Sequence, residues 1–313
     1  MREFINNVKI AGILVKHTLE ETTYEKNNNT VECIRGEVVV RTADDGEHTV
    51  KYFANRYTKD GNESKVYKAL QTVMNEYRTL EEFPDDPDYV EITSAHFGVN
   101  DYMSSNKNEV VSFNTVSANF INRIEKSKLE TTPLTATFEV EGVIASITDE
   151  IIKNEPTGNV NVTMNVITQT RNGNGKSATF EVNDMFPLKM VVPADLADTF
   201  KGIYSEGGFT KFTGVLINRA ETKTVVEKQA FGGDVTKTFT NTVRRIEILT
   251  GVNPVDIYSV ELTDDICSQL IAKRKAKIDE VKNGTKKSSG DTSTTTNTTT
   301  SSNPFANKNP FAK

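Results

Sequence analysis

The candidate functional residues of this sequence are cations and aromatic rings on one predicted β-hairpin. Its two strands, ECIRGEVVVRT (32–42) and HTVKYFANRYT (48–58), flank a turn at 43–46. Because side chains alternate between the two faces of a strand, Val50, Tyr52 and Ala54 share one face and point toward a core. The opposite face and the adjoining loop carry Arg41, Lys51, Phe53, Asn55, Arg56, Tyr57 and Lys59.

This combination is the one that sequence-tolerant binding of a single nucleic-acid strand requires. Cations neutralise phosphates, and each base stacked on an aromatic ring contributes about 1–3 kcal/mol. We therefore predict that this face binds single-stranded DNA. In the competing interpretation, Phe53 packs beneath a neighbouring helix and the charged groups only solvate the sheet.

A second group of cations surrounds a phenylalanine where two later strands are joined by QAFGGD (229–234). Any nucleic-acid contact of the second half of the chain is expected here, and the alternative is a simply solvated hairpin. The group consists of Lys223, Lys228, Phe231, Lys237, Arg244 and Arg245. Another hairpin of that half has polar outward positions, which make it a candidate surface for a protein partner. These positions are Asn161, Thr163, Asn165, Gln169, Thr179, Glu181 and Asn183.

Residues typical of enzymes and metal sites are scarce. His17, His48 and His96 stand singly, without HxH or HExxH spacing, so there is little material for imidazole catalysis. Cys33 and Cys267 form no CxxC pair, so neither a zinc knuckle nor a disulfide framework can be built from them. We expect no enzymatic activity, no cofactor and no bound metal.

Two apparent motifs fail on geometry. The segment 175–177, Gly-Lys-Ser, resembles the end of a phosphate-binding loop, but Thr170 stands where the first glycine is needed and a strand follows instead of a helix. We interpret it as a hairpin turn. An acidic group lies in an irregular turn set by Pro84 and Pro87, so its carboxylates do not converge on a cation. That group is Glu81, Glu82, Asp85, Asp86 and Asp88.

The elements that position these candidates follow an order that occurs twice, which indicates internal duplication. Short runs with period-two alternation predict strands, and one run with period 3.6 predicts a helix. The first unit has strands at 8–14, 32–42, 48–58, 89–99 and 108–124, with the helix at 64–77. The second unit has strands at 138–144, 160–170, 177–184, 210–227 and 236–251, with a helix-like segment at 193–204.

Five strands with a helix between the third and the fourth is the element order of the OB-fold, a small Greek-key barrel. Gly12 and Gly142 fall within the first strand of each unit, where the strand must bend to serve both sides of a barrel. We predict an all-β protein with minor α, built from two tandem OB-like five-stranded barrels at 1–128 and 133–258. A β-sandwich is the alternative, because element order alone does not fix how strands close.

A helix is predicted at 261–283, after the second barrel. Thr263 or Asp264 can cap its first turn, and Gly284 ends it. Its apolar stripe is predicted to be Ile266, Leu270, Ile271 and Ile278.

Residues 284–313 are predicted to be a disordered tail. They are mostly Gly, Ser, Thr, Asn and Lys, with too few apolar groups to offset the entropy of ordering them. Asn-Pro-Phe-Ala occurs at both 303–306 and 309–312. We expect partner docking through Phe305 and Phe311, with two copies raising avidity.

Composition and charge narrow the possible functions. A chain of 313 residues with 36% hydrophobic and 26% charged residues suits two domains with packed cores, and it has no apolar run near the ~18 residues of a membrane span. No secretion signal is recognisable, so we expect a cytoplasmic protein. The net charge is −6, with −9 over 1–282 and +3 over 283–313. This balance argues against a broad duplex-binding face but permits a narrow basic groove.

Tandem OB-like barrels, an acidic body, a Ser/Thr/Asn-rich tail and a phenylalanine-bearing tip together resemble the single-stranded DNA-binding proteins of bacteria and their phages. The resemblance is architectural and covers most of the chain. It implies a protein that coats unwound DNA during replication or recombination, in the host cytoplasm if the source is a phage, and that recruits replication proteins through its tail. It assigns stacking and phosphate contacts to Arg41, Lys51, Phe53, Arg56 and Tyr57.

The tail departs from that family, whose tails are acidic, because this one is slightly basic. Asn-Pro-Phe also resembles the peptides that eukaryotic EH domains bind. The competing class is a phage structural or assembly protein whose barrels bind protein instead of DNA. The pairing of basic and aromatic groups on the first hairpin favours DNA, because assembly alone does not need it.

Overall fold

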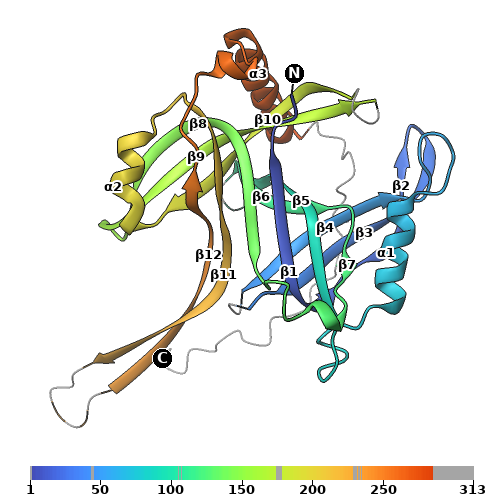
Figure 1. Ribbon diagram of the computed structural model, residues 1–313, viewed down its shortest axis with the longest axis horizontal. Coiled ribbons are helices and arrows are strands. Elements are labelled where there is room, and N and C mark those ends of the chain that lie inside the picture. Colours follow the sequence, from blue (N-terminus) through green and yellow to red (C-terminus); the bar gives the residue numbers. More distant parts are fainter. Residues whose placement is uncertain are drawn as a thin grey trace, which may run out of the picture.

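The computed structural model describes residues 2–43, 46–104, 106, 108–173, 178–227, 231, 233 and 235–284. Over these residues the chain is mostly β-strand with three α-helices (Figure 1). The predicted all-β class with minor α is therefore confirmed. Within the same residues, no helix has the length and apolar character needed to cross a membrane.

The first half of the chain forms a closed ring of five strands, which we call the first ring. Its members are β1 (Asn6–His17), β3 (Asn29–Arg41), β4 (Glu47–Asn55), β5 (Tyr89–Ser104) and β6 (Glu109–Ala118). They pair in the order β1–β3–β4–β6–β5 and back to β1, with β4 and β6 parallel and the other pairs antiparallel. The predicted helix, α1 (Lys65–Glu76), joins the third and fourth members and buries Tyr67, Leu70 and Val73.

Three short elements of the first half were not predicted as such. β2 (Glu20–Lys26) pairs with β3, and the two strands meet at a turn in which Asn27 and Asn28 have φ of 50° and 63°. Asparagine tolerates this left-handed conformation better than most residues. β7 (Asn122–Arg123) pairs with β5, and a 3₁₀ turn, η1 (Lys126–Lys128), follows it.

The second half repeats the arrangement as a second ring. Its members are β8 (Ala136–Ile152), β9 (Glu155–Asn172), β10 (Thr179–Val192), β11 (Phe209–Glu227) and β12 (Val235–Gly251), with α2 (Ala194–Ile203) between the third and fourth. The order is β8–β9–β10–β12–β11 and back to β8, and its one parallel pairing joins β10 to β12. Both rings therefore close in the same order, within one sheet rather than the two sheets of a sandwich.

Gly12 and Gly142 occupy equivalent places in the two rings. A Cβ atom on Gly12 would lie 2.1 Å from the carbonyl oxygen of Arg41, and one on Gly142 would lie 2.4 Å from that of Asn165. The register shifts between residues 14 and 16 in β1 and between 144 and 146 in β8. Each glycine thus allows close backbone approach. The register shift that marks the predicted bulge begins two residues after the glycine in both strands.

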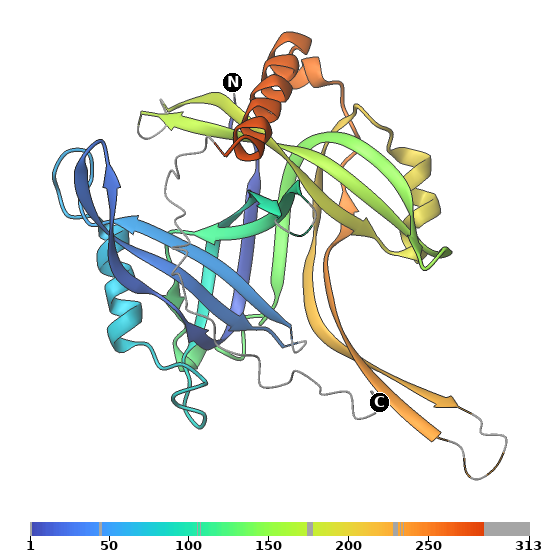
Figure 2. The same cartoon turned by 180° about the vertical axis from the view of Figure 1, so that it is seen from behind.

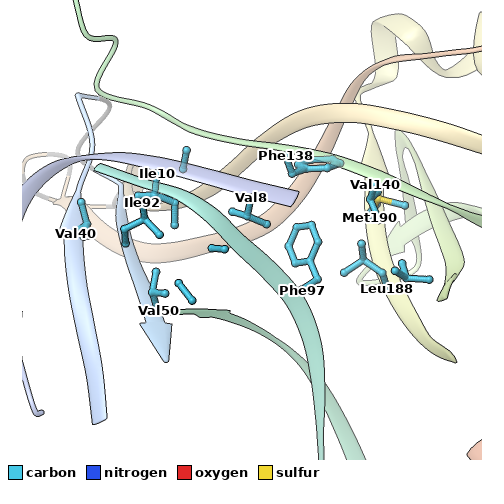
Figure 3. Packing of buried hydrophobic residues seen from close by; sticks show 14 of the residues in the cluster. Val8, Ile10, Val40, Val50, Ile92, Phe97, Phe138, Val140, Leu188 and Met190 are labelled. Carbon is cyan, nitrogen blue, oxygen red and sulfur yellow. The ribbon is translucent and has the colours of Figure 1, made fainter. Parts of the chain in front are cut away.

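The two rings share one sheet and one core. Asn6–Ile10 of β1 pair with Ala136–Val140 of β8, and the rings of Phe97 and Phe138 meet edge to face at 5.7 Å. Figure 3 shows the core running from the first ring into the second; its labelled members include Val40, Val50, Phe97, Phe138, Leu188 and Met190. The predicted domain limits, 1–128 and 133–258, stay predictions.

After the second ring come a 3₁₀ turn, η3 (Ile257–Val260), and the helix α3 (Asp264–Lys282). Thr263 caps α3 as predicted, because its hydroxyl accepts a hydrogen bond from the amide of Ile266. The predicted apolar stripe is partly wrong. Ile271 is 55% exposed, whereas Arg274, which was not part of the stripe, is buried. The tail with Phe305 and Phe311 lies outside the described residues.

Candidate nucleic-acid interface

The first hairpin, β3–β4, has the two faces that alternation predicts. Val38, Val50 and Tyr52 are buried, whereas Phe53 and Tyr57 are 40% and 53% exposed. Phe53 does not pack beneath α1, so the competing interpretation of this residue is wrong. Its ring lies 5.9 Å from that of Tyr24 on β2.

β2 therefore adds an aromatic ring to the predicted face, which sequence reasoning missed. The Tyr24 hydroxyl donates a hydrogen bond of 3.1 Å to Asn55 Oδ1, which orients both side chains. Opposite Phe53 on β3 lies Arg35, which pairs with Glu20 at 3.2 Å. The alternation of half-buried Thr22 and Tyr24 with exposed residues is the signal that could have predicted β2.

The predicted cations of this face are matched with carboxylates. Arg41 pairs with Glu47 at 2.6 Å, and the Lys51 ammonium lies 4.0 Å from Glu37. The exposed fractions of these four side chains lie between 32% and 46%. Exposed ion pairs are worth about 0–1 kcal/mol, so such cations can exchange a carboxylate for a phosphate at little cost.

The loop end of the face is arranged in the same way. Arg56 pairs with Glu32 at 2.8 Å, lies 3.9 Å from Glu63 and stands 5.5 Å from the ring centroid of Tyr57. The hydrogen bond to Glu32 raises the pKa of the Arg56 guanidinium further. Lys59 is exposed in the turn that follows. This end presents a cation, an aromatic ring and two carboxylates together.

A groove of about 480 Å³ lies between the two rings, and it joins the two predicted groups of cations. We call it the inter-ring groove. The residues that line it include Lys51 from the first group, Arg244 and Arg245 from the second, and Lys189. Among the described residues that line it, Glu37 is the one carboxylate. The lining is thus strongly cationic on a chain whose net charge is −6.

Two of the cations that line the inter-ring groove stand apart from carboxylates. Within the described residues, Lys189 and Arg244 have no carboxylate partner, and Arg244 Nε donates to Asn218 Oδ1 at 3.0 Å. Arg245 has a carboxylate nearby, Glu150, which does not line the groove. A hydrogen bond from Thr157 and, to a smaller extent, the charge of Arg245 lower the pKa of Glu150. Burial lowers the pKa of His48, which also lines the groove, to about 4. This histidine is therefore neutral at pH 7 and adds no charge.

Two asparagines fix the walls of the inter-ring groove by bonding from one ring to the other. Asn114 of β6 donates to the carbonyl of Pro187 at 2.8 Å and accepts from the amide of Lys189 at 3.2 Å. Asn218 of β11 donates to the carbonyl of Glu47 on β4. Such bonds hold the two rings at a set separation, so the groove is preorganised for a ligand.

An aromatic pair borders the inter-ring groove on the β5–β6 hairpin. Tyr102 and Phe113 are 46% and 40% exposed, and their rings meet edge to face at 5.9 Å. Lys51 Nζ lies 5.8 Å from the Phe113 centroid. We call these two rings the aromatic platform. Sequence reasoning missed the platform and Lys189, because only the folded chain brings β6 and β10 to the predicted cations.

Members of the second predicted group lie on a long projecting hairpin, β11–β12, which extends away from the rest of the chain in both views (Figures 1 and 2). Phe231 is 98% exposed near its end. Lys223 pairs with Phe239 and Lys237 with Val225 in the ladder, but their side chains are outside the description. Lys228 lies outside the described residues. Among the members of this group whose side chains are described, Arg244 and Arg245 line the inter-ring groove.

The β9–β10 hairpin of the second ring carries basic and aromatic groups beside its polar ones: Lys189, which lines the groove, and the pair formed by Arg171 and Phe180. Arg171 and Phe180 face each other across the ladder, with the guanidinium carbon 6.0 Å from the ring centroid. The predicted outward positions are polar: Asn183, for example, accepts from Thr168 at 2.8 Å. The predicted partner surface stays a prediction.

Of the two motifs set aside above, the structure describes the acidic turn. Residues 174–177 lie outside the described residues. In the acidic turn, Asp86 bonds to Lys126 at 2.9 Å, which with Arg78 lowers the pKa of Asp86, and Asp88 pairs with Arg123 at 3.0 Å. Cations therefore occupy these carboxylates. Across the described part of the chain, no cluster of three or more His, Cys, Asp or Glu residues could hold a metal ion.

A family model described as YorF matches residues 5–284. Among solved structures, the chain is similar to wild-type single-stranded DNA binding protein from Thermus aquaticus, with 11% identity and a TM-score of 0.45 over 81% of this chain and 95% of that one. Small single-stranded DNA-binding protein from Streptomyces coelicolor follows with 14% identity and a TM-score of 0.22, over 37% and 92% of the two chains. Replication protein A heterotrimer bound to ssDNA has 10% identity and a TM-score of 0.20, over 77% and 49%. No curated protein matches the sequence.

Proposed function

The chain belongs to the YorF family, and we propose that this member is a non-enzymatic protein that binds single-stranded DNA without sequence preference. The observation that carries the proposal is the inter-ring groove, where Lys51, Lys189 and Arg244 lie beside the exposed ring of Phe113. A flexible strand needs phosphate contacts and flat apolar rings together. A surface made only for protein assembly has no need of either in this arrangement.

The groove also accounts for DNA binding by an acidic chain. Four cations, Lys51, Lys189, Arg244 and Arg245, face one carboxylate, Glu37, within it. Acidic side chains elsewhere repel phosphates and so confine the strand to this path. The two asparagine bonds between the rings mean that binding does not first have to assemble the groove.

We propose that the bound strand runs from the β3–β4 face through the inter-ring groove toward the β11–β12 hairpin. Phe53 and Tyr57 stack bases at the start of this path, where Asn55 and Lys59 are additional contacts. Lys51 links that face to the groove, because it belongs to both. Further contacts along the path are assigned to Arg41, Arg56, Lys223, Lys228, Phe231, Lys237 and Arg244.

The biological setting proposed for this activity is DNA replication or recombination in a bacterium or a phage-infected host cytoplasm. Phe305 and Phe311 of the tail then dock replication or recombination proteins. Their repeated Asn-Pro-Phe-Ala context supports a bivalent contact. The basic charge of the tail favours a partner with an acidic surface.

The test is fluorescence anisotropy of a labelled oligo-dT of a few tens of nucleotides, titrated with the full chain at low and moderate salt. We expect tight, salt-sensitive binding to this strand and much weaker binding to a duplex of equal length. An oligo-U of the same length measures the preference for DNA over RNA.

Paired variants locate the site. Lys189→Ala removes a charge from the groove and should weaken binding, whereas Lys65→Ala removes an exposed charge from α1 and should not. No binding at low salt by the wild-type chain would refute the proposal. The competing class, an assembly protein that binds protein surfaces, would then be the better account.

A further inference from the structure

The aromatic platform sits on a part of the β5–β6 hairpin that leaves the first ring. β5 pairs with β1 only up to Ala95, and β6 pairs with β4 only at Ser117 and Ala118. Beyond these points, as far as Ser104 and Glu109, the two strands pair only with each other. A two-stranded hairpin has little stability by itself, so something else must hold the platform in place.

The two faces of this hairpin have different neighbours. The β5–β6 ladder has no register shift, so side chains alternate strictly. Tyr102 and Phe113 lie on the exposed face. Asp101 and Ser112, which face each other in the ladder, lie on the opposite face. That opposite face is turned toward α3.

Arg274 of α3 binds Asp101 on the face of the hairpin opposite the aromatic platform. Its Nη1 lies 2.5 Å from Asp101 Oδ2 and its Nη2 lies 2.6 Å from Asp101 Oδ1, in a bidentate pair. Nη2 also donates to Ser112 Oγ at 3.3 Å, and Ser112 donates to Asp101 at 2.6 Å. The side chains of Arg274 and Asp101 are only 9% and 5% exposed. A buried pair of this geometry is strong and directional, and losing one partner leaves a buried charge uncompensated.

The same helix is anchored on the second ring. Lys277, one turn after Arg274, pairs with Asp184 of β10, and α3 contacts β5, β6 and β10. Figure 2 shows the helix lying across this region. Through these two ion pairs α3 connects the back of the β5–β6 hairpin to β10, which also carries the groove residue Lys189.

We infer that Arg274 is a positioning residue for the aromatic platform, so that docking of α3 and binding of a strand in the inter-ring groove are coupled. This inference rests on the function proposed above. No residue of α3 lines the groove, so the helix acts through Asp101 and Ser112 rather than by touching the strand. Residues 283–313 come after α3 in the sequence, and a partner that bound them and pulled α3 off the two rings would weaken DNA binding.

Coupling between two sites is reciprocal at equilibrium. If the docked helix holds the platform ready for bases, a bound strand must in turn stabilise the docked helix by the same factor. Amide protons of α3 should therefore exchange more slowly when DNA is bound, although the DNA does not contact the helix. A purely structural role for Arg274 predicts no such change.

The experiment compares Arg274→Met with Lys275→Met in the full chain. Each variant removes one positive charge from neighbouring positions of α3, but Lys275 is exposed. We expect Arg274→Met to raise the Kd for oligo-dT at least about 5-fold, the lower end of typical coupling between sites. Lys275→Met should change it less than about twofold, because salt screens an exposed charge. Hydrogen exchange of peptides from α3 is measured in both variants and in the wild type, with and without oligo-dT.

The outcomes separate this inference from the proposed function. If the wild type binds oligo-dT, Arg274→Met binds like Lys275→Met and exchange of α3 ignores the DNA, the coupling is wrong while the function stands. If the wild type does not bind, both fail together. Should Arg274→Met not fold, as judged by circular dichroism and thermal melting, Arg274→Lys keeps the charge but loses the bidentate pair. It must then show weakened binding and reduced protection of α3, and normal values would overturn the inference.

Discussion

The β5–β6 and β11–β12 hairpins occupy the same place in their rings, as fourth and fifth strands, but they have opposite surroundings. The first is held from behind by Arg274 and by the bonds of Asn114 to β10. The second pairs only with itself from Leu216 outward and ends near Phe231, which is 98% exposed. The groove lies between the docked hairpin and the base of the projecting one.

One hairpin therefore presents a preformed surface, and the other extends the molecule beyond the two rings. Rings that are already fixed lose little freedom when bases stack on them, whereas a fully exposed ring must be immobilised on binding. The sequences agree with this division. The docked hairpin has polar groups that bond on its inner face, while the projecting one reads TKTFTNTV, whose threonines suit an exposed ribbon.

The largest expected effect is a difference in local stability between the two hairpins. Amide protons at 110–116 of β6 should exchange at least about 100-fold more slowly than those at 236–242 of β12, because the first segment opens only when its buried contacts break. Hydrogen exchange with peptide resolution measures this. Equal rates would mean that the docked hairpin is no better held than the arm.

A smaller but still large effect is expected from reversing charge in the groove between them. Lys189→Glu together with Arg244→Glu should lower the affinity for oligo-dT by about 100-fold at low salt. Each phosphate contact with a single strand contributes about 0.7 to the slope of log Kd against log salt. Losing two contacts should therefore reduce this slope by about 1.4. Lys65→Glu on α1 serves as the control, and an unchanged slope in the double variant would place the phosphates elsewhere.

Truncating the docked platform should have the next effect. Phe113→Ala should cost about 1–3 kcal/mol of binding free energy, the value of one lost stack, and so should Phe53→Ala or Tyr57→Ala on the β3–β4 face. Anisotropy titrations at one salt concentration suffice. If only the Phe53 and Tyr57 variants weaken binding, the strand bypasses the groove.

Truncating the projecting hairpin at its exposed ring should matter less. We expect Phe231→Ala to cost below about 1 kcal/mol, because immobilising a side chain that is 98% exposed offsets much of the stacking energy. The same titration, run beside Phe113→Ala, gives the comparison directly. A loss larger than that of Phe113→Ala would reverse the roles of the two hairpins.

The smallest effect is expected from pH. The groove that the two hairpins border is charged by Lys and Arg, and His48 within it stays neutral because burial lowers its pKa to about 4. Affinity should therefore be flat between about pH 6 and 8. The free energy of unfolding should fall as the pH drops from about 6.5 toward 4. In this range His48 takes up a proton in the unfolded chain but stays neutral in the folded one. Chemical denaturation of the wild type and of His48→Gln at pH 7 and pH 5 checks the sign.

Local patterns were enough to predict much of the fold. Alternation placed Val50 and Tyr52 inside and Phe53 outside, and the repeated element order predicted strands that the structure closes into two similar rings. Gly12 and Gly142 were informative because close backbone approach leaves no room for a Cβ at either position. These features depend on near neighbours in sequence or on one strand pair.

What could not be predicted depends on the meeting of distant segments. Lys51 and Arg244 were both proposed as contacts, but nothing in the sequence says that they line one groove. Phe113 looked like an ordinary strand residue, because its exposure depends on what docks behind it. Arg274 was passed over in favour of an apolar stripe on α3, since a buried arginine is recognisable only once Asp101 is known to face it.

The junction between β1 and β8 has a consequence for how the chain can be divided. Five consecutive residues of each strand pair across it, and the core beneath it is continuous. A protease cut between η1 and β8 would therefore yield two fragments that remain associated through backbone hydrogen bonds and shared apolar side chains. Made separately, such fragments are expected to find one another and complement, rather than to behave as independent modules.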